Sequence, residues 1–178
     1  QVSIAINQFT STLRQAANPQ IMKNQNTNNE NRSLFLVYII SKYSYLSMSI
    51  FFFSIIFCIT DLLNFWLVNP PEYTNIFIIF MLINGMLSNL GAGFDACIQA
   101  TGNIRQNQIG FCLINLAYLP IIYFLYRFGM PPYINVIIMI PLTIITLAFQ
   151  VYIMCKITSF DYNTYLQQTI KPCIVTTA

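Results

Sequence analysis

Residues 84–105, NGMLSNLGAGFDACIQATGNIR, decide the fold because they place polar and acidic groups inside a strongly apolar sequence. On a helix, steps of three, four and seven residues bring four polar residues onto one face: Asn84, Ser88, Asp95 and Gln99. A neighbouring row of small residues at 88, 92, 96 and 100 favours close packing of membrane helices. A membrane helix that carries a carboxylate must face other protein or a wet cavity. Ala-Thr-Gly at 100–102 predicts the end of this helix.

The composition indicates an integral membrane protein. Of the 178 residues, 56% are hydrophobic and 7% are charged, whereas soluble domains carry roughly 25% charged residues. The net charge of +3 is small and scattered along the chain, which does not favour nucleic-acid binding. We therefore expect the lipid bilayer, and no nucleic acid, among the partners.

Catalytic and metal chemistry are not indicated. The sequence contains five cysteines, none in a CxxC pair, and no histidine. The cysteines lie in or beside apolar runs, which is typical of small packing residues. We expect no catalytic residue, no metal site and no cofactor, so the protein is not predicted to be an enzyme.

Four apolar runs are long enough to cross a bilayer, which requires about 20 apolar residues. They cover approximately residues 34–60, 74–100, 109–126 and 133–155. The first crossing proper is predicted at 43–60, with Lys42 reaching the interface. Pro120 and Pro141 predict bends in the third and fourth runs, which are either static kinks or points where the helices flex.

Two further helices are predicted to be partial. Residues 1–17 have the character of the second half of a bundle helix, which Asn18-Pro19 is predicted to end, and Lys171-Pro172 is predicted to open another. The chain starts with Gln and stops inside an apolar run, so we expect an internal piece of a longer protein. The fold class is therefore all-α, a polytopic membrane bundle. We expect residues 1–178 to form a single transmembrane domain with four complete and two partial helices.

The basic residues predict the orientation. If the spans alternate, the connections at 18–33, 101–108 and 156–171 share one side. All eight basic residues except Arg127 belong to these connections or their flanks. The other side carries 61–73 and 127–132. Because cytoplasmic loops are enriched in Lys and Arg, the basic side is predicted to be cytoplasmic.

Three motifs occur in order along the chain: ANPQI at 17–21, WL…PEY at 66–73 and QATGNIR at 99–105. This ordered set resembles the bacterial Wzx-like flippases of O-antigen and capsule, which belong to the multidrug/oligosaccharidyl-lipid/polysaccharide exporter superfamily with its MATE-type fold. Asn103 departs from the family, which usually has Lys there.

The resemblance implies a multi-pass protein of the bacterial inner membrane, with this chain in the C-terminal of two pseudo-symmetric lobes. It implies alternating access and the movement of undecaprenyl-diphosphate-linked oligosaccharide, the repeat unit of lipopolysaccharide O-antigen or capsule, to the periplasmic leaflet. Two alternatives stay open. One is a MATE-type drug or cation antiporter, and the other is a membrane polymerase or ligase of the same polysaccharide pathway.

The candidate substrate- or ion-binding residues are Asp95, Gln99, Ser88, Asn84, Arg14 and Arg105. Asp95 either binds a coupling H⁺ or Na⁺, or pairs with a basic group elsewhere, or is simply hydrated near the cytoplasmic end. Asn84, Ser88 and Gln99 either bind sugar hydroxyls or form hydrogen bonds between helices. We favour the bonds between helices. Arg14 either contacts a diphosphate or anchors its helix at the interface, and we favour the anchor.

Overall fold

The computed structural model describes residues 2–26, 30–66, 71 and 73–177. All regular structure in these residues is helical, which confirms the predicted all-α class. The elements are α1 (Val2–Asn26), α2 (Glu30–Trp66), α3 (Thr74–Asn89), α4 (Phe94–Ala100), α5 (Ile104–Arg127), α6 (Ile134–Ile157), α7 (Tyr162–Tyr165), the π-helical turn η1 (Leu166–Ile170) and α8 (Lys171–Thr177).

Four segments of the described chain are long and apolar enough to cross a membrane. They are Glu30–Phe65, Thr74–Ala100, Ile104–Arg127 and Ile134–Ile157. Each overlaps one of the predicted runs, so the predicted number of complete spans is confirmed as a property of length and composition.

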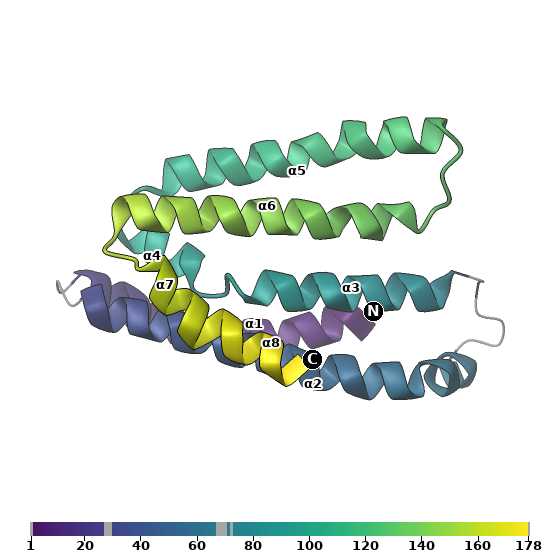
Figure 1. Ribbon diagram of the computed structural model, residues 1–178, viewed down its shortest axis with the longest axis horizontal. Helices are drawn as coiled ribbons and strands as arrows, with labels where there is room; N and C mark the ends of the chain where they lie inside the picture. The colour runs from purple at the N-terminus through teal and green to yellow at the C-terminus, as the bar shows by residue number, and fades with distance from the viewer. Residues whose placement is uncertain (1, 27–29, 67–70, 72, 178) are drawn as a thin grey trace.

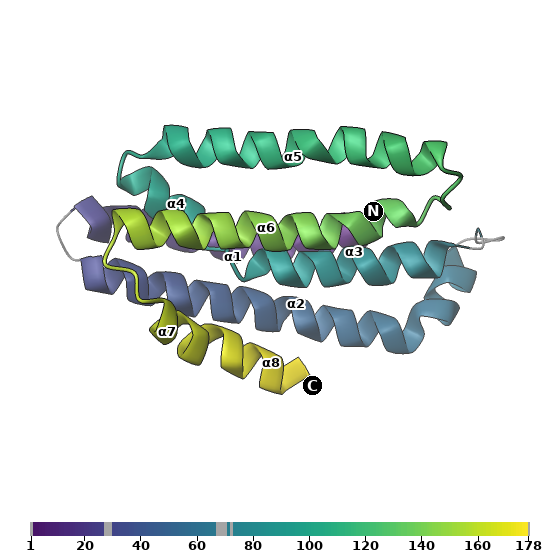
Figure 2. The same cartoon turned by 45° about the horizontal axis from the view of Figure 1, so that its top comes forward.

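The long helices lie side by side in one bundle (Figure 1). In Figure 2 the order runs from α5 at one edge, through α6, α3 and α2, to α7 and α8 at the other edge. The end of α1, the start of α2 and the α4–α5 and α6–α7 connections lie at one end of the bundle. The end of α2, the start of α3 and the α5–α6 connection lie at the other end (Figure 1). The predicted alternation of the spans is therefore confirmed, and it places the three basic connections together. Their cytoplasmic location stays a prediction.

An aromatic cluster holds the basic end together. Tyr38, Phe94, Phe160 and Tyr165 come from four separate segments, and each is buried. Their ring centroids lie 5.4 to 6.0 Å apart in tilted or edge-to-face arrangements. Such pairs add about 0.5–1.5 kcal/mol each beyond the burial of their area. The cluster fixes α4 against α2 and the segment that follows α6.

The prediction that Asn18-Pro19 ends the first helix was wrong. α1 continues through Pro19 to Asn26, and Ile21 is fully buried beyond the proline. The polar composition after residue 19 indicated a loop, but α1 packs against α2 and α4. Neighbouring helices of this kind can compensate for the carbonyl that a proline leaves free.

The last helical segment starts earlier than predicted. It begins at Tyr162 rather than Lys171, because Asp161 caps it by accepting hydrogen bonds from the backbone N–H groups of Asn163 (3.1 Å) and Thr164 (3.3 Å). Hydrogen bonds from the Thr164 hydroxyl and from these N–H groups lower the pKa of Asp161. Residues 158–161 therefore form a short turn, and the rest of the connection predicted at 157–170 is helical.

Neither predicted proline bend interrupts its helix. α5 and α6 run on across Pro120 and Pro141, whereas α2 has non-helical backbone at Cys58 (φ −114°, ψ 15°), where no proline occurs. Most of residues 69–73, between α2 and α3, lie outside the described residues.

Candidate functional site

The segment that carries Asp95 is not one helix. Between α3 and α4 the backbone tightens into hydrogen bonds of the 3₁₀ type, from Leu90 N–H to Leu87 C=O and from Ala92 N–H to Asn89 C=O, both 3.1 Å. The prediction of an unbroken helix from 74 to 100 was therefore wrong. The predicted stop after Ala100 is confirmed, because Gly102 follows it with φ +80°.

The break between α3 and α4 packs closely against its neighbours because Gly91 and Gly93 have no Cβ atom. A Cβ atom on Gly91 would lie 2.8 Å from Leu147 Cδ2 and 2.9 Å from Gln150 Oε1, and one on Gly93 would lie 3.1 Å from Val37 Cα. The broken segment is therefore pressed against α6 on one side and α2 on the other. The Tyr165 hydroxyl donates a 2.8 Å hydrogen bond to the Leu90 carbonyl, which the break leaves free.

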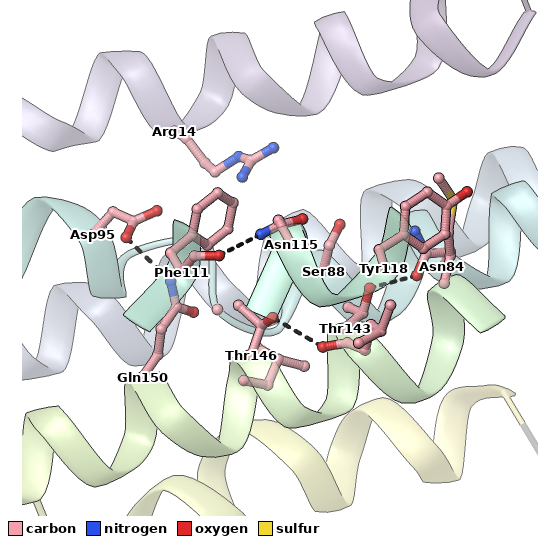
Figure 3. Close-up of a pocket in the computed structure, with 14 residues that line it drawn as sticks. Arg14, Asn84, Ser88, Asp95, Phe111, Asn115, Tyr118, Thr143, Thr146 and Gln150 are labelled. Carbon is pink, nitrogen blue, oxygen red and sulfur yellow. Dashed lines mark hydrogen bonds between the residues drawn. The ribbon is translucent and has the colours of Figure 1, made fainter. Parts of the chain in front are cut away.

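A cavity of about 460 Å³ lies beside this break, among α1, α3, α5 and α6 (Figure 3). Its walls are rich in polar groups: Arg14, Asn84, Ser88, Asp95, Asn115, Tyr118, Thr143, Thr146 and Gln150. Phe111, Met139, Leu142 and Leu147 supply apolar surface. A volume in the range of about 300–1,000 Å³ is usual for small-molecule sites.

Two amide side chains hold the Asp95 carboxylate in place. Asn107 of α5 donates through Nδ2 at 3.0 Å, and Gln150 of α6 donates through Nε2 at 3.1 Å. Both bonds end on Oδ1, and no described residue donates to Oδ2. Asn107 and Gln150 are buried while Asp95 is exposed. The two amides thus hold the carboxylate through Oδ1, and Oδ2 is left at the cavity wall.

Arg14 brings the opposite charge to the same cavity. Figure 3 shows its guanidinium pointing into the cavity from α1. Its Nε atom is buried and has no hydrogen-bond partner among the residues that the structure describes. Asp95 interacts with Arg14 electrostatically. This placement does not fit the interfacial anchor that we favoured from the sequence.

The neutral polar groups divide into two kinds. The Thr143 hydroxyl donates to Asn84 Oδ1 at 2.6 Å, and the Tyr118 hydroxyl donates to Asn135 Oδ1, so these pairs join neighbouring helices. Ser88 donates to the carbonyl of Gly85 within its own helix, at 2.9 Å. A hydroxyl that donates its proton to its own helix keeps oxygen lone pairs that can accept from a ligand.

Four of the six predicted site residues therefore line one cavity: Arg14, Asn84, Ser88 and Asp95. Gln99 and Arg105 do not line it, and both are exposed. The break at 90–93 re-aims α4, so Gln99 no longer continues the face that starts at Asn84.

Sequence reasoning missed the contribution of α5 and α6. Thr143, Thr146 and Gln150 are spaced three and four residues apart in an otherwise apolar helix, which is the pattern of one polar face. Asn107 and Asn115 of α5 were missed in the same way. These intervals were the available signal, but none of these residues carries a charge, so none stood out.

Comparison of the chain with models of protein families, with curated proteins and with solved structures finds no match. The opposite charges, hydroxyls and amides of the cavity form a surface suited to binding a polar or charged molecule. No cluster of three or more metal-ligating His, Cys, Asp or Glu side chains occurs in the described part of the chain.

Proposed function

We propose that this chain is part of an alternating-access transporter of the MATE-type fold that moves a lipid-diphosphate-linked oligosaccharide across the bacterial inner membrane. The observation that carries the proposal is Arg14, whose guanidinium points into a cavity lined by hydroxyls and amides and whose Nε has no hydrogen-bond partner among the described residues. The planar guanidinium matches diphosphate oxygens, since it forms paired hydrogen bonds to them. The resemblance of the three sequence motifs to those of the Wzx-like flippases supports the same substrate class.

Each part of the cavity has a role in this proposal. Arg14 binds the diphosphate, while Ser88, Asn115 and Thr146 offer hydrogen bonds to sugar hydroxyls. Asp95 holds the coupling H⁺ or Na⁺ and balances the charge of Arg14 while the substrate is absent. The cavity takes only the diphosphate and the nearest sugar, because about 460 Å³ is too small for a whole oligosaccharide.

Asp95 also supports a second candidate, a MATE-type antiporter for cationic molecules. Its Oδ2 has no donor among the described residues, and its side chain is exposed at the cavity. A carboxylate in that setting can bind an organic cation or a proton in turn. The two candidates differ in which charged residue meets the transported molecule.

The test is a flipping assay on the full-length protein in proteoliposomes, with a fluorescent lipid-diphosphate oligosaccharide. Arg14→Gln should lower the flipping rate at least about tenfold, because a hydrogen bond to a charged group contributes about 1.5–3 kcal/mol. The control Arg105→Gln removes a cation outside the cavity and should leave the rate unchanged. Equal rates for Arg14→Gln and the unmodified protein would exclude the proposed role. Proton-driven uptake of a cationic dye without lipid flipping would establish the antiporter instead.

A further inference from the structure

A second hollow lies on the other side of the bundle, between α2 and the η1–α8 segment. Figure 2 shows this segment lying along α2, at the opposite edge from α5. The hollow has a volume of about 660 Å³, and we call it the lysine groove because Lys42 of α2 and Lys171 of α8 both line it. It shares no residue with the cavity that contains Asp95.

The charge in the lysine groove has one sign. No Asp or Glu is among its lining residues, which are all described. Asp161 lines an adjoining, smaller hollow, and its carboxylate accepts hydrogen bonds from the first turn of α7. Lys42 of α2 and Lys171 of α8 lie on opposite walls of this one hollow. A groove with two ammonium groups and no facing carboxylate is complementary to an anion.

The walls of the groove are apolar and open. Phe35, Tyr43 and Val175 line it with 55%, 60% and 70% of their surfaces exposed. A free inorganic anion gains nothing from these surfaces, whereas an amphiphile covers them with its hydrocarbon. The occupant that fits both features has an anionic head and an apolar tail.

The lysine groove lies at the depth in the membrane that is expected for a lipid headgroup. Lys42 lies roughly 18 Å along α2 from Glu30, at about 1.5 Å per residue. The sequence predicts that the membrane crossing begins at Tyr43, directly after this lysine. Lys42 therefore stands at the predicted interface, where the phosphates of bilayer lipids lie.

The π-helical turn shapes the far wall of the groove. In η1 the backbone N–H of Lys171 donates to the carbonyl of Leu166, five residues earlier. Pro172 follows and has no N–H to donate. Gln167 and Gln168 of this turn line the groove and add amide donors beside the two lysines. π-Turns of this kind occur frequently at functional sites.

We propose that the lysine groove binds the headgroup of an anionic bilayer phospholipid. The two ammonium groups and the Gln167 and Gln168 amides bind the phosphate, and the acyl chains cover Tyr43 and Val175. The inference depends on the chain lying in a bilayer, which its four long apolar segments support. It does not depend on what the other cavity transports.

The test measures lipid binding to the purified full-length protein by native mass spectrometry, with phosphatidylglycerol and phosphatidylcholine as probes. Phosphatidylglycerol should bind more tightly than phosphatidylcholine. Each lysine-to-glutamine change in the groove should weaken phosphatidylglycerol binding about fivefold, because one lysine near an anionic headgroup contributes about 1 kcal/mol. The double variant Lys42→Gln/Lys171→Gln should therefore lose most of the preference.

Two controls make the result decisive. The pair Lys23→Gln/Lys156→Gln removes the same charge outside the groove and should leave the affinity unchanged. The pair Lys42→Arg/Lys171→Arg keeps the charge and should retain binding, which separates loss of charge from misfolding. An equal loss in the Lys23/Lys156 pair would overturn the proposal in favour of general surface attraction. Displacement of the lipid by millimolar inorganic phosphate would overturn it in favour of a free-anion site.

Discussion

The two hollows of this bundle use charge in opposite ways. In the cavity beside the α3–α4 break, Asp95 and Arg14 bring both signs together, and buried amides from α5 and α6 fix the carboxylate. In the lysine groove both charges are positive. Among the described residues, no side-chain hydrogen bond holds Lys42, Lys171, Gln167 or Gln168. The carboxylate of the cavity is thus held in one geometry, whereas the groups proposed to bind a headgroup in the groove are not fixed in this way.

The largest effect is expected from filling the close contact behind the cavity. Gly91→Val should destabilise the protein by about 2 kcal/mol, because the new side chain overlaps Leu147 and Gln150. It should also displace Gln150 from Asp95, while phosphatidylglycerol binding in the groove stays unchanged. Thermal unfolding in detergent measures the first effect and native mass spectrometry the second.

Ala148→Val serves as the control for this change. It adds two carbon atoms, against three in Gly91→Val, at an exposed position of α6 and should leave stability within about 0.5 kcal/mol. If the two variants unfold at the same temperature, the contact between the break and α6 is not a tight one.

A smaller effect is expected from neutralising the carboxylate. Asp95→Asn should reduce lipid-linked oligosaccharide flipping about tenfold, since the hydrogen bonds from Asn107 and Gln150 are made to a charged acceptor. In cells this variant should lower surface polysaccharide at normal expression. Asp61→Asn, at an exposed position of α2, should not. Unchanged polymer in the Asp95 variant would return this residue to the interpretation of simple hydration.

The smallest effect is expected at the link between the two regions. Tyr165 precedes η1, whose glutamines line the groove, and its hydroxyl bonds the Leu90 carbonyl at the break beside the cavity. Tyr165→Phe should cost about 1 kcal/mol, because it removes the hydroxyl that donates to that part-buried carbonyl. Amide hydrogen exchange at 90–94 should rise relative to Tyr162→Phe, which removes an exposed hydroxyl in the same turn. Equal amide exchange at 90–94 in the two variants would show that the Tyr165 hydroxyl does not link the cavity to the lysine groove.

Local composition was enough for the coarse fold. Apolar runs such as 133–155 predicted their spans because the requirement for about 20 apolar residues does not depend on what the helix packs against. The glycine after Ala100 ended its helix for a similarly local reason, since a φ of +80° costs Gly102 little. The polar composition after Pro19 wrongly indicated that the first helix ends there. Packing of α1 against α2 and α4 sustains the helix beyond the proline.

The sequence by itself determined the all-helical class, the four long apolar segments, their alternation and the presence of a costly carboxylate at Asp95. Only the tertiary structure decided which groups meet that carboxylate. Gln150 lies 55 residues away from it along the chain, and Arg14 lies on a helix whose continuation past Pro19 the sequence did not predict. Helical periodicity assigns residues to the faces of one helix, but the glycine break re-aims α4 and the packing of α1, α5 and α6 closes the cavity.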